Sequence, residues 1–353
     1  MLGVAGMTKT MFSASSLGPL AELHVHVGGS VDPAVMWTIA HDQGIRLPSK
    51  DYWDFVNLIT VPEDGRIKSL DDYAALFHWT ELIQSSPEAI ERSVHQIIGG
   101  GYRKCNITTM ELRFNPMKRN RGGERDMDHI IAGAVRGMER AQLEYPAVRA
   151  GLIIMMDRTL TVEQNEIIAR KAIHYAERGR GIIGVDIAGP RHPDFRYGDY
   201  KRVIGACRRA GLGITIHCGE EGDPAEMWEV LEQLEPKRIG HGILAAGNEA
   251  LMKELARRDV VLEICPTSNV KTHAVSGLDD LRQVLRTFLD HGVRFSISTD
   301  GPEMLQTNVA KEFELLVNEG ILSAEEAAAA NQCAHEASFL RGKVYPGLAL
   351  GIF

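Results

Sequence analysis

Short runs of apolar, often β-branched residues recur along the chain and alternate with longer segments of helical periodicity. We predict eight strands. The first begins at Glu22 and lies in the segment that ends with the glycine pair Gly28-Gly29. The others are expected at 107–114, 150–156, 181–189, 214–217, 238–241, 260–265 and 293–299. Helices are expected from Pro87 and at 127–144, 162–178, 200–210, 224–234, 249–258 and 278–291.

Strands that alternate with helices indicate parallel pairing through right-handed crossovers. Eight such units match a closed (β/α)8 TIM barrel of the α/β class. The competing fold is an open, doubly wound sheet. Its usual fingerprint, GxGxxG directly after the first strand, is absent from this sequence. The barrel also explains why several predicted strands end in polar residues, because its active site lies at the carboxyl ends of the strands.

The alternation is interrupted after the first strand. A helix is expected from Asp32-Pro33, where the proline occupies the first turn. Leu70, Tyr73 and Phe77 then recur at helical spacing, which suits either an ordinary core face or a lid over a pocket. We therefore predict a loose tail over 1–20 and a single barrel domain over 21–353, with a helical insertion at about 33–84.

Composition narrows the class of protein. The 353 residues are 44% hydrophobic and 24% charged, which is typical of a globular protein with a large core. The formal net charge of -8 disfavours a nucleic-acid surface, so a small-molecule partner is expected. The five cysteines form no CxxC pair and indicate reduced thiols, and no stretch approaches a membrane span or a signal peptide. A cytoplasmic location is the resulting expectation.

Histidines and carboxylates stand at the ends of four predicted strands. His24 and His26 share one side of the first strand, because alternate residues of a strand point the same way. HxH alone also fits an exposed edge strand. His217 ends the fifth strand, His241 the sixth, and Asp300 follows the eighth. Three imidazoles and a carboxylate suit a divalent ion, with zinc as the expected metal, which would make hydroxide available at neutral pH.

These motifs together resemble the adenosine deaminase family of zinc-dependent purine deaminases. HVH, IHCGE, RIGHG, EICPTSN and STD occur in the family's order, and MELRFNP and VDIAG look like its strands. The resemblance implies one zinc ion per chain, held by His24, His26, His217 and Asp300. It also implies that Glu220 protonates N1 of a 6-aminopurine as hydroxide adds to C6. His241 would orient that hydroxide, and Asp300 would share its proton.

The same resemblance assigns residues to substrate binding. The backbone N–H of Gly189 would meet N3 of the purine, and Leu70, Tyr73, Ala74 and Phe77 would form an apolar gate above it. Gly28 and Gly301 depart from the family, which commonly has acids there for the ribose 5′-hydroxyl and for N7. Pro190-Arg191 likewise replaces an acid that the family has after the VDIAG glycine.

We hypothesise that Gly28 enlarges the 5′ side of the pocket, because a site built for a free 5′-hydroxyl would keep its acceptor. A candidate substrate is 6-amino-6-deoxyfutalosine, a nucleoside of menaquinone biosynthesis that some relatives deaminate. Its carboxylate would be received by Arg191, Arg66 or Lys68. Adenosine itself, methylthioadenosine and adenine are the alternatives. The sequence predicts no oligomeric state.

Other classes of protein remain open on the sequence. A binuclear amidohydrolase would need a bridging lysine at the end of the fourth strand, which reads VDIAG instead. Cytidine-deaminase-type zinc enzymes require HxE with PCxxC, and this chain has no such cysteine pair. A catalytically silent purine-binding protein would not need all four expected ligands together with Glu220 and His241.

Overall fold

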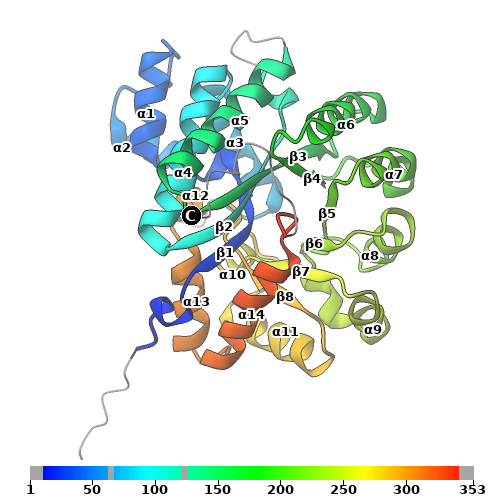
Figure 1. Cartoon of the computed structure of the whole chain (residues 1–353). Coiled ribbons are helices and arrows are strands. Elements are labelled where there is room, and N and C mark those ends of the chain that lie inside the picture. The colour runs from blue at the N-terminus through cyan, green and yellow to red at the C-terminus, as the bar shows by residue number, and fades with distance from the viewer. Residues whose placement is uncertain (1–10, 63–66, 121–125, 342–353) are drawn as a thin grey trace, which may run out of the picture.

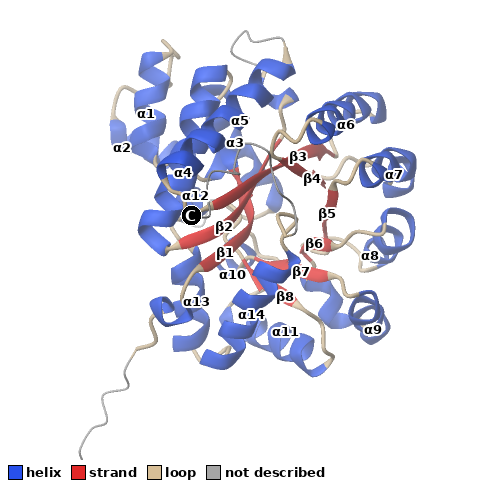
Figure 2. Ribbon diagram, viewed as in Figure 1, coloured by secondary structure: helices blue, strands red, loops and turns tan. Residues whose placement is uncertain are grey.

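The computed structural model describes residues 11–62, 67–120 and 126–341, and eight strands form its centre. The strands are β1 (Leu20–His26), β2 (Ile107–Phe114), β3 (Arg149–Asp157), β4 (Ile182–Ala188), β5 (Gly213–Cys218), β6 (Arg238–His241), β7 (Val261–Ile264) and β8 (Phe295–Ile297). Each pairs in parallel with the next, in the order β1 to β8. The predicted (β/α)8 barrel is confirmed, with the strands inside a ring of helices (Figures 1 and 2).

The barrel closes at the level of the predicted metal ligands. Val25 forms a parallel bridge with Asp300, beyond the end of β8. The His26 N–H donates to the Asp300 carbonyl and the Asp300 N–H donates to the His24 carbonyl, each at 2.8 Å. The segment that carries the aspartate is thus hydrogen-bonded to the strand that carries two of the histidines.

The helices agree with the predicted alternation in most places. The outer ring contains α4 (Pro87–Cys105), α5 (Met127–Glu144), α6 (Val162–Glu177), α7 (Lys201–Arg209), α8 (Ala225–Glu229), α9 (Glu249–Arg258) and α11 (Leu278–Asp290). The helix expected at 224–234 continues past α8 as a π-helical turn, Val230–Leu234. Four further helices were not predicted: α10 (Pro266–Lys271), α12 (Pro302–Leu305), α13 (Val309–Asn318) and α14 (Ala324–Ala337).

The predicted insertion is helical. It consists of α1 (Pro33–Asp42), α2 (Tyr52–Ile59) and α3 (Leu70–Ile83), which lie together on one side of the barrel (Figure 1). The insertion is attached to the segment after β8, because the Val61 N–H donates to the Met304 carbonyl at 2.8 Å. A small apolar cluster joins the two, formed by Val61, Ile67, Tyr73, Met304 and Leu305 with Leu70, Leu76 and Phe77 packed against it.

The expected loose tail is wrong for the residues from 11 onward, while residues 1–10 lie outside the described part of the chain. Ala14 begins a short 3-10 helix and is buried. Its N–H donates to Glu314, and the Phe12 N–H donates to Asn318. This segment is therefore fixed against α13, a helix that was not predicted from the sequence. No helix among the described residues is both long enough and apolar enough to cross a bilayer.

Candidate metal centre and purine pocket

The barrel brings the predicted ligands together from both ends of the sequence. His24 and His26 lie on β1, His217 is on β5, and Asp300 follows β8. All four are at least nine-tenths buried. His26 Nε2 is 3.1 Å from His217 Nε2 and 3.3 Å from Asp300 Oδ1, while His24 Nε2 is 3.8 Å from the same oxygen. The residues fall into two overlapping groups whose possible ligand atoms lie within 4.8 Å of one another, His24 with His26 and Asp300 and His24 with His217 and His241.

These distances test whether a zinc ion fits. Ligand atoms about 2.1 Å from a tetrahedral ion lie about 3.4 Å from one another, close to the spacings found here. His24 Nε2 is buried and has no hydrogen-bond partner among the described residues, as expected of an atom that binds an ion. Burial lowers the pKa of His24, His26 and His217 well below the usual value, so each imidazole is neutral and able to coordinate. The donor set fits zinc.

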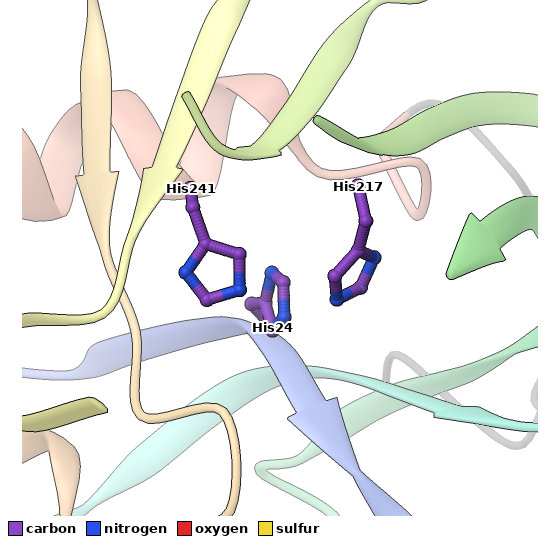
Figure 3. A group of neighbouring side chains, drawn as sticks. All are labelled: His24, His217 and His241. Carbon is purple, nitrogen blue, oxygen red and sulfur yellow. The ribbon is translucent and has the colours of Figure 1, made fainter. Parts of the chain in front are cut away.

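His241 also enters this cluster. Its ring lies 4.9 Å from that of His24 and 5.4 Å from that of His217, centroid to centroid. Figure 3 shows the three rings pointing toward one another. Gly240 makes the convergence possible, because a Cβ at that position would lie 3.0 Å from His24 Cε1 and 3.2 Å from the His217 ring. The glycine before His241 thus leaves room for two imidazoles.

Two site residues have strained backbones. His241 has a φ of 61° and Asp300 a φ of 68°, in the left-handed region that costs an L-residue roughly 1–2 kcal/mol. Such strain concentrates at functional sites, where the surrounding structure imposes it. At both positions the chain leaves a strand, and the turn directs the side chain toward the barrel axis.

Carboxylates behind the histidines fix their orientation. Glu263 Oε2 on β7 lies 2.7 Å from His24 Nδ1, and Asp186 Oδ2 on β4 lies 2.8 Å from His217 Nδ1. The contact at His24 is a hydrogen bond that holds the proton on Nδ1 and leaves Nε2 as the metal-facing atom. The Asp186 contact is close, but among the described residues His217 Nδ1 makes no hydrogen bond of normal geometry. These two acids are not among the site residues predicted from the sequence. The available signal was a single acid inside an otherwise apolar strand, as in VLEIC and VDIAG.

The two acids belong to an ion-pair network that fills the barrel interior. Arg113 on β2 donates to Asp186 at 2.8 Å and to Glu263 at 2.7 Å. Arg238 on β6 donates to Glu263 at 2.6 Å and to Glu111 at 2.5 Å. All five side chains are completely buried. Buried charges need partners, and here acids and arginines from four strands neutralise one another beneath the histidines.

Glu220 and His241 face each other beside the histidine cluster. His241 Nε2 is 3.5 Å from Glu220 Oε2, and the Thr272 hydroxyl donates to Glu220 Oε1 at 3.1 Å. Asn269 Nδ2 donates to His241 Nδ1 at 2.9 Å, while Asn269 Oδ1 accepts from the Cys265 N–H. This amide orientation makes Nδ1 an acceptor, so the proton of neutral His241 is on Nε2 and faces the pocket. Burial raises the pKa of Glu220 to about 7.

A pocket opens over this cluster. His26, His217, Glu220, His241 and Asp300 line it together with a wall formed by Met155, Ala188, Gly189 and Pro190. Leu70, Tyr73, Ala74 and Phe77 of α3 also line it. Helix α3 therefore combines the two alternatives suggested by its periodicity. It packs an apolar face against the chain and also forms one wall of the pocket. Charged side chains complete the lining: Glu81, Lys118, Asp157 and Arg158.

Several residues assigned to substrate binding lie elsewhere. Arg191 pairs with Glu226 and does not line the pocket. Lys68 is exposed and outside the lining, and Arg66 lies outside the described residues. The cations that do reach the pocket, Lys118 and Arg158, were missed. They follow β2 and β3, where any residue just beyond a barrel strand was a candidate.

The expected enlargement at Gly28 is wrong. A Cβ on Gly28 would lie 2.7 Å from Phe77 Cδ1 and 3.3 Å from the Thr80 hydroxyl, so α3 already occupies that space. The space beside Gly301 is also occupied by α3, since a Cβ added at this position would lie 2.6 Å from the Tyr73 hydroxyl. Neither glycine lines the pocket. The absent side chains make room for a helix of the same chain.

The (β/α)8 barrel brings three histidines, Asp300 and Glu220 together at the ends of its strands. This combination is typical of a metal-dependent hydrolase. Comparison with known proteins gives the family. The adenosine deaminase family model matches residues 19–352. The chain is 29% identical to the adenosine deaminase of Shewanella woodyi over 327 residues, which cover 92% of this chain and 96% of that one. The chain belongs to the adenosine deaminase family, and it is a metal-dependent purine deaminase.

Solved structures share the fold. The adenine deaminase of Arthrobacter aurescens superposes with a TM-score of 0.80 at 22% identity, covering 91% of this chain and 94% of that one. An amidohydrolase from Burkholderia ambifaria with bound zinc gives a TM-score of 0.78 at 19% identity, with 94% and 90% covered. At these identities the likeness establishes the barrel, and the substrate has to be argued from the pocket.

Proposed function

We propose that this chain hydrolyses the exocyclic amine of a 6-aminopurine nucleoside of the adenosine type, giving the 6-oxo product and ammonia. The observation that carries the proposal is the arrangement of Glu220 and His241 beside four buried metal-ligand candidates in one pocket. One zinc ion, held by His24, His26, His217 and Asp300, would supply a Lewis acid that lowers the pKa of water toward 7.

The roles of the surrounding side chains follow from their protonation states. A carboxyl group donates to a ring nitrogen only when it carries a proton, and burial raises the pKa of Glu220 far enough for that. We assign Glu220 to N1, because proton donation there lets electrons leave C6 as water adds. His241 presents Nε2–H toward the same space and orients the attacking water. Asp300, whose pKa burial raises to about 6, accepts the proton of that water.

The pocket lining favours a nucleoside over a free base. A free purine would need only an apolar slot with a few polar groups at its edge. Here Glu81, Lys118, Asp157 and Arg158 add charge to the lining. Asp157 is fully buried and lies 2.5 Å from Lys118 Nζ. Such groups suit the hydroxyls of a sugar or a polar substituent on it.

The 5′-extended candidate loses the support that Gly28 was expected to give, because Phe77 fills that position. Lys118 and Arg158 offer a different argument for it. Arg158 donates to the Tyr197 hydroxyl at 3.4 Å, but its Nε is buried and finds no hydrogen-bond partner in the part of the chain that the structure describes. A substituent carboxylate, as in 6-amino-6-deoxyfutalosine, would find these cations in the pocket. That nucleoside therefore belongs in the test beside adenosine.

The test is ammonia release from a panel of 6-aminopurines, with metal content measured on the same preparation. The panel contains adenosine, adenine, 5′-methylthioadenosine and 6-amino-6-deoxyfutalosine. We expect about one zinc per chain and a higher kcat/KM for adenosine than for adenine. Preference for adenine would overturn the nucleoside assignment. No turnover of any member by zinc-loaded protein would instead indicate a silent purine-binding protein.

A further inference from the structure

Helix α3 fills the two positions where strand-end side chains are missing. The side chains of Tyr73 and Phe77 are four residues apart and share one face of α3. The Phe77 ring lies over Gly28, and the Tyr73 hydroxyl takes the place of a side chain at position 301. The backbone of Gly301 has a φ of −131°, which any residue adopts, so glycine is needed there for space.

The Tyr73 hydroxyl is an unusual group in this pocket. The residue is 4% exposed and lines the pocket beside Asp300. Its hydroxyl lies close enough to the Asp300 carboxylate to interact with it, but within the described residues it makes no hydrogen bond of normal geometry. Asp300 is otherwise engaged, since Oδ2 accepts from the Ser268 hydroxyl at 2.8 Å and Oδ1 faces the histidines. A buried hydroxyl without a well-formed hydrogen bond is unfavourable, and a bound molecule in the pocket would supply a better acceptor than the engaged Asp300 carboxylate.

The chemistry of the purine selects the acceptor. An aminopurine offers three ring nitrogens with lone pairs, N1, N3 and N7. Under the proposed function, Glu220 takes N1 and the Gly189 N–H is assigned to N3. N7 remains, and it flanks C6 on the side opposite N1. We infer that the Tyr73 hydroxyl donates a hydrogen bond to N7 of the substrate and so contributes to the choice of purine.

This inference rests on the proposed function, but it concerns a residue supplied by the inserted helix. The barrel strands would set the reaction, and α3 would contribute a contact to the five-membered ring. Tyr73→Phe is a suitable probe because it removes only the hydroxyl. Since that hydroxyl makes no hydrogen bond of normal geometry within the described residues, the change should leave the melting temperature nearly unaltered.

The experiment compares inosine with 7-deazainosine, which lacks the N7 lone pair, as competitive inhibitors and by calorimetry. Turnover of adenosine by the unmodified protein is measured first, so that failure of the proposed function is recognised separately. We expect the unmodified protein to bind inosine about 3- to 10-fold more tightly than 7-deazainosine, the equivalent of one neutral hydrogen bond. In Tyr73→Phe the preference should fall below about 2-fold.

Two further variants sharpen the result. Tyr102→Phe is the matched control, because Tyr102 on α4 is half-buried and outside the pocket, and it should keep the full preference. Gly301→Ala retains the tyrosine but places a Cβ where the hydroxyl lies, and it should abolish the preference as Tyr73→Phe does. An unchanged preference in Tyr73→Phe would overturn the inference. So would equal weakening of both ligands, which would mean that Tyr73 acts through Asp300.

Discussion

Replacing Glu263 by glutamine tests whether the interior ion network supports the metal site. Glu263 accepts from four groups: Arg113, Arg238, the Thr215 hydroxyl and His24 Nδ1. Glutamine has nearly the same volume and keeps one acceptor oxygen, but an NH2 group, which donates hydrogen bonds, replaces the other carboxylate oxygen. That amide would face the Arg113 guanidinium and His24 Nδ1, both of which also donate. The His24 ring would then favour a proton on Nε2, the atom expected to bind the ion.

The magnitude follows from burial. Removing one partner of a buried ion pair costs about 3–5 kcal/mol, because the remaining charge is left without compensation. Here Arg113 keeps Asp186 and Arg238 keeps Glu111, so the lower end of that range applies. Burial by itself raises the pKa of Glu263, but the charges and hydrogen bonds of Arg113 and Arg238 outweigh it and lower the pKa to about 2, so the acid is ionised in this network. Loss of a group that orients a ligand histidine typically costs about 10- to 100-fold in metal affinity.

The assay is denaturant unfolding of the metal-free protein together with zinc titration. Glu312→Gln is the control, because Glu312 is equally buried but accepts from Thr307 and Thr267 instead of an arginine. We expect Glu263→Gln to lose about 3 kcal/mol and at least tenfold in zinc affinity, and the control to lose less of both. If Glu263→Gln changed the unfolding free energy by under about 1 kcal/mol and left zinc affinity intact, the supporting role of the network would be refuted.

Three further predictions concern the ion, the acid and the lid. Removing zinc with a chelator should abolish deamination and lower the melting temperature, and added zinc should restore both; activity that survives at under about 0.1 zinc per chain would contradict the ligand assignment. Because burial raises the pKa of Glu220 to about 7, its proton-donating form is lost above that pH, and kcat should fall on the alkaline side. Glu220→Gln should lower kcat by at least about 100-fold, and a kcat that is flat from pH 6 to 9 in the unmodified protein would exclude this role. Gly28→Asp should destabilise the protein by about 1–3 kcal/mol because its Cβ would meet Phe77, whereas unchanged stability would show that α3 yields readily.

The periodic parts of the fold and the ligands at strand ends were predictable from the sequence. Strands alternating with helices gave the barrel, and a barrel brings strand ends together, so His24 and Asp300 were expected to meet. The helices after β8 were missed, as was the attachment of residues 11–19 to α13. That attachment depends on single polar contacts, such as the bond from the Ala14 N–H to Glu314, and has no periodic signature.

The residues that surround the ligands were less accessible to sequence reasoning. Glu263 and Asp186 are single acids inside apolar strands, and only the closed barrel shows that they point at histidines. The expectation at Gly28 failed for a different reason. A missing side chain indicates space, but the sequence does not say what occupies it, and here the occupant comes from a helix about fifty residues further along.

This difference explains why the reaction class was easier to establish than the substrate. The residues proposed for chemistry are fixed by strand register and by a buried ion network, so they follow from motifs. The residues that would distinguish one purine from another include Tyr73 and Phe77 on α3, which rests against Gly28 and Gly301 through side-chain contact. A shift of this helix would alter the shape of the pocket without moving any of the residues proposed to bind the metal. Specificity in this chain should therefore be sought on the insertion, and substitutions on the face of α3 should change substrate preference before they change zinc binding.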